Sequence, residues 1–239
     1  MKQNWRFIPL LRESGAMQMA IDGWLLQQHL EGKQPSILRF YTWAKPTVSL
    51  GYHQRHYPDF WNQLVAEGKI DLVCRPTGGR AVLHQDDLTY MVITSNFTGR
   101  RVEVYQRICE FLIEGWRSRG VELHYGTAGR GYIHNPNCFG TATGADLVTP
   151  EGDKLIGSAQ VKKGSSILQH GSMRLSSETS LYRQIFNEPL TPLSLATASP
   201  DEMFIQSLIE ALKTSACENF DINLLEQPLS AEEWQAIQK

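Results

Sequence analysis

Short apolar segments, which alternate between a helical and a strand-like period, limit how this chain of 239 residues can fold. The longest uninterrupted apolar run has four residues, Tyr90 to Ile93. A membrane-spanning helix needs about 20 apolar residues, so these segments favour the core of a globular protein. Hydrophobic residues make up 41% of the chain and charged residues 20%, which supports a sizeable core and argues against disorder. The first residues, Met1 to Arg6, lack the apolar stretch of a secretory signal.

The apolar spacing predicts helices and strands in mixed order. Ser14 can cap a first helix that ends near Gly32, and Ser230 begins a capping box with Glu233. Further helices are expected over residues 59–67, 102–120, 177–186 and 201–213, and strands over residues 36–41, 47–50, 70–75, 88–94, 121–125, 145–149, 154–159 and 167–173. Because hairpins are common in this order, we expect an α+β fold.

A stretch rich in proline suggests a division of the chain. Residues 189–200 contain several turn-forming residues and no clear periodicity. We therefore expect a main domain over residues 1–190 and a small helical C-terminal appendage over residues 191–239.

Charge and cysteine content exclude several classes of protein. The formal net charge is -2, which gives no reason to expect binding to nucleic acid or to an anionic membrane. The four cysteines are scattered without a CxxC pair, so we expect neither a metal site nor a disulfide framework. A reducing cytoplasm suits this usage best.

One cysteine stands apart from the others. Cys138 lies in a long polar segment, residues 126–144, where a thiol can be a nucleophile or a small buried filler. By contrast, Cys109 lies on an apolar helix face, Cys74 ends a predicted strand and Cys217 follows an apolar helix, so we expect these three to be structural.

Two further segments carry candidate functional residues. In the first, Gly78 and Gly79 would let backbone N–H groups approach a ligand, with Arg75, Arg80 and His84 close by in the sequence. The alternative is a plain tight turn with solvated arginines.

The second segment holds Lys154 and His170. A lysine after a turn is most often solvated, but a desolvated lysine beside a thiol would stabilise the thiolate. His170 can act as an acid or base, or can be a strand histidine with satisfied hydrogen bonds.

Read together, these segments resemble the biotin/lipoate protein ligase family. The motifs that carry the resemblance are Met19-Ala-Ile-Asp22, Arg39-Phe-Tyr, Leu50-Gly-Tyr-His-Gln54, Arg75-Pro-Thr-Gly-Gly-Arg-Ala-Val-Leu-His84, Leu88-Thr-Tyr90, Cys138-Phe139, Lys154-Leu-Ile-Gly-Ser-Ala-Gln160 and Ile167-Leu-Gln-His-Gly-Ser172. The resemblance covers roughly residues 4–190 and implies a mixed, largely antiparallel sheet with flanking helices. Many relatives have two arginines before the proline, whereas this chain has Cys74 ahead of Arg75.

Within the family the chain is most similar to LipM-type octanoyltransferases. The resemblance implies transfer of octanoyl from acyl carrier protein to a lysine of a lipoyl-domain protein, such as the glycine cleavage H protein or an E2 subunit. It implies an acyl-cysteine intermediate on Cys138, with Lys154 lowering the pKa of that thiol and moving protons. No ATP, other cofactor or metal is then needed.

The same resemblance assigns substrate-binding residues. They are Arg75, Gly78, Gly79, Arg80, His84, Gly157 and Gln160. Backbone N–H groups of the Gly78-Gly79 loop or around Gly157 could bind the oxyanion. Because acyl carrier proteins are acidic, a local basic patch is also expected, with Lys162-Lys163 and Arg100-Arg101 as candidates.

Three alternatives remain open at this point. An ATP-dependent lipoate–protein ligase would use ATP and Mg²⁺ with the glycine loop and Lys154, and would not need Cys138. A lipoyl amidotransferase would share both residues with the octanoyltransferase. A non-catalytic lipoyl- or acyl-binding subunit would bind acyl groups without turnover.

Overall fold

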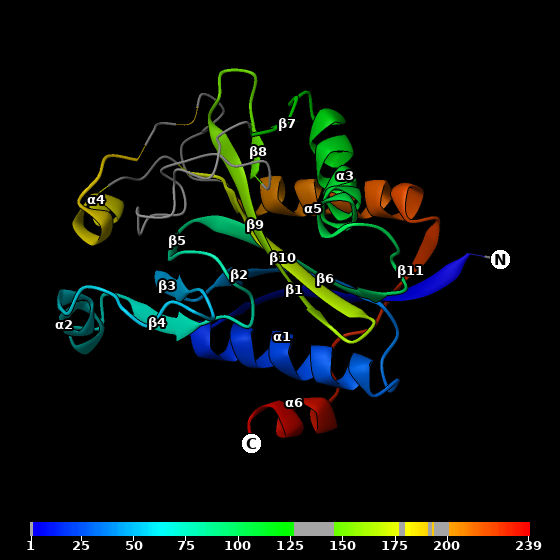
Figure 1. Ribbon diagram of the computed structural model, residues 1–239, viewed down its shortest axis with the longest axis horizontal. Helices are drawn as coiled ribbons and strands as arrows, with labels where there is room; N and C mark the ends of the chain where they lie inside the picture. Colours follow the sequence, from blue (N-terminus) through cyan, green and yellow to red (C-terminus); the bar gives the residue numbers. More distant parts are fainter. Residues whose placement is uncertain (1, 127–145, 177–179, 191–192, 194–200) are drawn as a thin grey trace.

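The computed structural model describes residues 2–126, 146–176, 180–190, 193 and 201–239, and two β-sheets organise this part of the chain (Figure 1). The large sheet has eight strands in the order β11-β1-β2-β6-β10-β9-β8-β7, and the small sheet has the order β4-β3-β5. The strands of the large sheet are β1 (Gln3–Glu13), β2 (Ile37–Trp43), β6 (Asp87–Ser95), β7 (His124–Tyr125), β8 (Asp146–Val148), β9 (Lys154–Lys163), β10 (Ser166–Arg174) and β11 (Ile222–Glu226). Those of the small sheet are β3 (Thr47–Leu50), β4 (Asp71–Cys74) and β5 (Val82–His84).

Most strand pairs in the large sheet are antiparallel. Strand β1 pairs in parallel with β2 and with β11, and every other pair in this sheet is antiparallel. The mixed, largely antiparallel α+β architecture expected for this chain is therefore confirmed.

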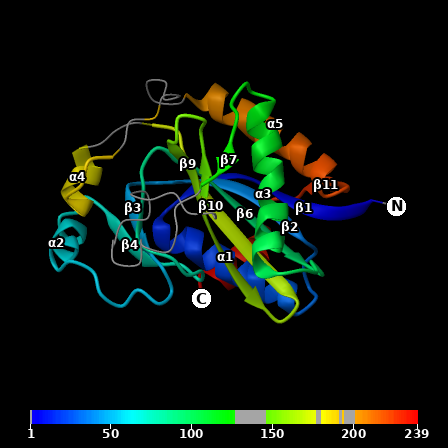
Figure 2. The same ribbon diagram turned by 45° about the horizontal axis from the view of Figure 1, so that its top comes forward.

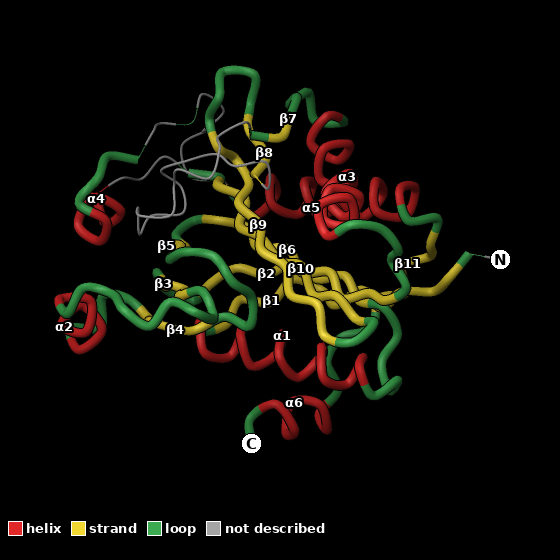
Figure 3. The backbone as a smooth tube through the Cα atoms, in the orientation of Figure 1, coloured by secondary structure: helices red, strands yellow, loops and turns green. Residues whose placement is uncertain are grey.

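Helices cover both faces of the large sheet (Figures 1 and 3). Helices α3 (Arg101–Arg117) and α5 (Glu202–Asn219) lie on one face, and α1 (Gly15–Leu30) and α6 (Ala231–Ile237) lie on the other. Each face has its own apolar core, one centred on α3 and α5 and the other on α1. A third core joins the small sheet to α2 (Phe60–Ala66) and α4 (Ser180–Phe186), at the other end of the molecule from β11 (Figure 2).

The caps predicted from the sequence begin their helices. The side chain of Ser14 accepts a hydrogen bond from Met17 N at the start of α1, and Ser230 forms the expected capping box with Glu233 at the start of α6. Each side chain satisfies a backbone N–H that has no partner within the helix.

Residues after 190 contribute to the main body of the protein. Helix α5 packs against α3, and β11 adds an edge strand beside β1, with Ile222 in the same core as Trp5. Helix α6 packs on α1, and Arg6 donates to both carboxylate oxygens of Glu233. The expected appendage, residues 191–239, thus contains a strand as well as helices, and the division of the chain near residue 190 stays a prediction.

Strand β1 was not predicted. It contains Pro9, which cannot donate a ladder hydrogen bond, and its pairing with β2 shifts register between Ile8 and Leu11. The irregularity accommodates the proline in a strand that has neighbours on both sides. No helix in the described part of the chain is long and apolar enough to cross a membrane.

Candidate functional site

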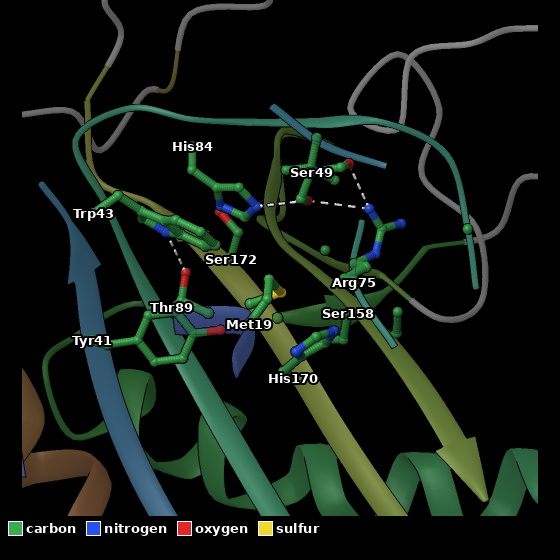
Figure 4. Close-up of a pocket in the computed structure, with 15 residues that line it drawn as sticks. Met19, Tyr41, Trp43, Ser49, Arg75, His84, Thr89, Ser158, His170 and Ser172 are labelled. Atoms are coloured by element: carbon green, nitrogen blue, oxygen red, sulfur yellow. Dashed lines mark hydrogen bonds between the residues drawn. The ribbon is translucent and has the colours of Figure 1, made fainter. Parts of the chain in front are cut away.

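A pocket lies where the small sheet meets strands β9 and β10 (Figure 4). Its apolar walls come from Met19, Tyr41, Trp43 and Val82, and its strand backbone comes from Gly157 and Gly171. The other lining residues are Ser49, Arg75, Gly79, His84, Thr89, Ser158, Ala159, His170 and Ser172. Of the substrate-binding residues predicted from the sequence, the structure therefore brings Arg75, Gly79, His84 and Gly157 together at one cavity.

His84 is fixed in this pocket by partners on both ring nitrogens. Its Nδ1 lies 2.9 Å from Asp87 Oδ2, and its Nε2 lies 2.9 Å from Ser49 Oγ. A carboxylate only accepts, so Nδ1 donates to Asp87, and Nε2 shares a hydrogen bond with the serine hydroxyl. The ring also stacks on Trp43, with 4.0 Å between centroids. These contacts hold the His84 ring in one orientation in the wall of the pocket.

Arg75 shapes the glycine loop. Its Nη2 donates to the carbonyls of Gly78 (2.9 Å) and Arg80 (2.7 Å), and its Nη1 donates to the carbonyl of Ser49 (2.7 Å). A buried guanidinium with these contacts holds the loop against β3. Arg75 therefore lines the pocket as a scaffold for the loop, and direct contact with substrate stays a prediction.

The glycine at position 79 is required by the geometry of this loop. Its φ is +100°, and a Cβ at that position would lie 2.8 Å from Arg75 Nη2. Across the loop, a Cβ on Gly51 would lie 1.9 Å from the carbonyl oxygen of Gly79. The two backbones therefore approach too closely for a side chain at Gly51, whereas at Gly79 the positive φ and the Arg75 guanidinium disfavour one.

A buried charged cluster supports the floor of the pocket. Asp22 accepts from Arg39 Nε (3.0 Å), from Tyr41 Oη (3.2 Å) and from His170 Nδ1 (3.0 Å). Burial tends to raise the pKa of Asp22, but Arg39 and His170 outweigh that effect and hold it below its ordinary value. Asp22 is therefore ionised at neutral pH.

His170 links this cluster to the glycine loop. Burial lowers the pKa of His170 below its ordinary value, and the hydrogen bond to Asp22 only partly opposes this shift. The neutral ring donates from Nδ1 to Asp22, so Nε2 accepts the hydroxyl of Thr77 at 2.7 Å. Of the two interpretations of His170, the structure favours the strand histidine with satisfied hydrogen bonds.

Lys154 is the first residue of β9 and is buried. Its Nζ lies 2.9 Å from Asp146 Oδ1, and both side chains are less than a tenth exposed. The alternative of a solvated surface lysine is therefore wrong. Asp146 lies on the neighbouring strand β8, which pairs with β9 across the turn. The predicted nucleophile, Cys138, and the adjacent Phe139 lie outside the described residues.

The remaining predicted residues lie beside the pocket. Gly78 and Gln160 line a second, open groove, and the carboxamide of Gln160 donates to Gln169 Oε1. Arg80 is half-buried next to the loop, and its carbonyl accepts from Arg75.

The cysteines differ in exposure. Cys109 is buried as expected, and burial raises the pKa of its thiol to about 12. Cys74 ends β4, as the sequence predicts, and is exposed there; its structural role stays a prediction.

Sequence reasoning missed the partners of the site residues. Asp87, Asp146 and Thr77 were not singled out. For Asp146 a signal existed, because the hairpin register predicted from the turn places it close to the start of the next strand.

Comparison with known proteins identifies the family. The model for the lipoyl protein ligase A/B catalytic domain matches residues 14–231. The chain belongs to this family. It is 33% identical to octanoyltransferase LipM of Carboxydothermus hydrogenoformans, over 97% of this chain and 92% of that one. It is also 33% identical to octanoyltransferase LipM of Bacillus cereus, over 99% and 94% of the two chains. These matches confirm the family and the enzyme class, an octanoyltransferase, that the motifs indicate.

Solved structures confirm the fold. A putative lipoate protein ligase from T. acidophilum superimposes with a TM-score of 0.79 at 22% identity, covering 100% of this chain and 93% of that one. A lipoate-protein ligase A bound with ATP superimposes with a TM-score of 0.76, also at 22% identity and with the same coverage.

Proposed function

We propose that this chain transfers an octanoyl group from a carrier-protein thioester to a lysine of a lipoyl domain, through an acyl intermediate on Cys138. The similarity to octanoyltransferases supports the reaction class. The observation that carries the assignment of Lys154 is its burial against Asp146, three residues before the pocket residue Gly157. A desolvated, oriented ammonium suits the control of a nearby thiol better than a solvated one does.

Each half of the reaction exchanges one bond for another. In the first, the Cys138 thiolate attacks the thioester carbonyl, a C–S bond forms to Cys138, and the carrier thiolate leaves and takes a proton. In the second, the lysine amine attacks the acyl-cysteine, a C–N bond forms, and Cys138 leaves as thiolate while the amine loses a proton. Lys154 exchanges these protons. Both the donor and the intermediate are thioesters, so the free-energy change of the first step is close to zero and the step needs no ATP.

The pocket suits the acyl tail. Met19, Tyr41, Trp43 and Val82 offer apolar surface, and the polar groups around it are already engaged with one another. An acyl chain that enters this pocket would gain about 0.8 kcal/mol per buried methylene.

Two protein partners follow from this reaction. The donor is an acyl carrier protein and the acceptor is a lipoyl domain. A related solved structure with a TM-score of 0.72, a bipartite lipoate protein ligase from Thermoplasma acidophilum, is described together with its E2 lipoyl domain. Because the acyl group is covalently bound to Cys138 between the two steps, the carrier protein and the lipoyl domain need not bind at the same time.

Intact mass spectrometry tests the proposal. Wild-type protein incubated with octanoyl–acyl carrier protein, without ATP, should gain one octanoyl group that hydroxylamine removes. Cys138→Ala should gain none. Cys74→Ala is the matched control, because Cys74 is an exposed thiol outside the pocket, and this variant should be acylated like wild type.

The same samples distinguish the alternatives. If wild-type protein gains no octanoyl group but modifies a lipoyl domain when given lipoate and ATP, the protein is a ligase and the transferase proposal is wrong. If lipoyl transfer between two lipoyl domains is much faster than transfer from the carrier protein, the chain is an amidotransferase. Retention of a stoichiometric acyl group without any transfer would indicate a binding subunit.

A further inference from the structure

A basic groove opens directly beside the acyl pocket. It is lined by the cations Arg101, Lys162 and Lys163 together with Tyr52, His53, Pro76, Gly78, Gly99, Val104, Gln160, Val161 and Ile167. No carboxylate is among these lining residues, which all belong to the described part of the chain. A surface with this charge attracts anions even though the formal net charge of the chain is -2.

The three cations are presented to solvent. All three are exposed, and within the described ranges no carboxylate pairs with any of them. Arg101 Nη2 donates to the carbonyl of Gln160 at 3.1 Å, which holds the guanidinium over the end of β9. The neighbouring Arg100 differs, because its guanidinium pairs with Glu103. Of the two basic pairs expected from the sequence, the lysine pair and only the second arginine line the groove.

The groove and the pocket share two walls. Along β9, Gly157 to Ala159 line the pocket and Gln160 to Lys163 line the groove. In the glycine loop, Gly79 lines the pocket and Gly78 lines the groove. From Ser158 to Lys163 the strand rises by roughly 17 Å. An extended phosphopantetheine arm is about as long as six residues of extended chain, so it spans this distance.

We infer that this basic groove is the docking surface for the acidic acyl carrier protein. This inference rests on the proposed function, because it assumes that a carrier-bound thioester is the donor. The carrier's acidic surface would lie against Arg101, Lys162 and Lys163, and its arm would follow β9 past the glycine loop into the pocket. The positive charge of the groove complements the acidic surface of the carrier protein. The distance from the groove to the pocket matches the length of the phosphopantetheine arm.

Charge reversal distinguishes an effect on docking of the carrier protein from an effect on the chemical step. The variant carries Lys162→Glu and Lys163→Glu, and the control carries Lys2→Glu and Lys69→Glu. The control pair changes the net charge equally, and both of its lysines are exposed and outside the groove. Each protein is acylated with octanoyl–acyl carrier protein and, separately, with octanoyl-pantetheine, which carries the same thioester without the protein.

We expect the groove variant to be acylated more slowly by one donor only. At low salt, the kcat/KM for octanoyl–acyl carrier protein should be about tenfold or more lower in the groove variant than in wild type. The kcat/KM of the control variant should stay within about twofold of wild type. Acylation by octanoyl-pantetheine should be unchanged in both. The defect should shrink as salt is added, because wild-type binding itself weakens when exposed charges are screened.

Other outcomes separate the failure of the inference from that of the proposed function. If both donors acylate the groove variant as fast as wild type, the carrier protein docks elsewhere. If acylation is normal but transfer to the lipoyl domain slows, the groove binds the acceptor and the inference is wrong. If neither donor acylates wild-type protein, the proposed function itself is wrong.

Discussion

Replacing Asp22 by asparagine removes the negative charge from the cluster beneath the pocket and leaves the positive charge of Arg39 in place. Arg39 is 1% exposed and Asp22 is fully buried, with 2.9 Å between the guanidinium and the carboxylate. Breaking a buried pair by removing one partner costs about 3–5 kcal/mol, because an uncompensated charge remains inside. Asp22→Asn should therefore lower the free energy of unfolding by that amount, a large share of the 5–15 kcal/mol typical of a folded protein.

Urea unfolding measures this loss directly. The midpoint should fall while the slope stays the same, since the surface exposed on unfolding does not change. The double variant Asp22→Asn/Arg39→Met should be at least as stable as Asp22→Asn alone, because it removes the orphaned cation as well. Glu67→Gln is the control, since Glu67 forms an exposed ion pair with Lys69. Loss of this ion pair should not change the free energy of unfolding measurably.

The pH dependence gives an independent measurement of the same cluster. The pKa of Asp22 in the folded state lies below its ordinary value of 3.8. Its ionisation therefore stabilises the fold above that pH, and the contribution is lost as the pH falls through the lower, folded value. The stability curves of wild type and Asp22→Asn should converge in acid. A loss of less than about 1 kcal/mol at neutral pH would refute the reasoning that Arg39 depends on this carboxylate.

Three further outcomes follow from the site. Gly79→Ala should cost more stability than Gly32→Ala in urea unfolding and should raise KM for the octanoyl donor, because both glycines have positive φ but only a Cβ at 79 meets a fixed side chain, Arg75. In His170→Gln, stability should fall less steeply than in wild type as the pH drops below about 6.5, since burial lowers the pKa of His170 and the unfolded chain takes up the proton first. Peptide mapping after iodoacetamide at pH 8 should find Cys109 unmodified in the native protein, because its pKa of about 12 keeps the thiol protonated; modification at the rate of an exposed thiol would contradict this.

Local chemistry explains which parts of the fold could be predicted from the sequence. Helix α1 follows from Ser14 and the apolar spacing after it, and α6 follows from the Ser230 capping box. Strand β1 could not be predicted, because its neighbours, β2 and β11, come from distant parts of the chain and Pro9 interrupts its pattern. Pairing with distant strands overrides a weak local preference.

The same distinction holds for the site. The glycine loop and Lys154 lie in recognisable motifs, so the sequence identifies them. The hydrogen bonds that fix them join residues far apart, such as His170 and Asp22, which are 148 positions apart. A single sequence carries no signal for such a pair, since each residue alone is equally compatible with a solvated surface.

Strand β9 combines the three parts of the proposed reaction in one element. Lys154 begins it, Gly157 to Ala159 line the acyl pocket, and Lys162 and Lys163 end it in the basic groove. Side chains alternate along a strand, so a shift by one residue would exchange which of these side chains lie on each face of the sheet. The register is fixed by continuous pairing with β10 and by the close approach at Gly171, where a Cβ would lie 2.7 Å from the carbonyl of Gly157. The order of residues along β9 therefore sets the proposed order of three parts: Lys154 first, then the acyl pocket, then the docking surface for the carrier protein. For this reason the docking surface can be inferred from the strand that holds Lys154.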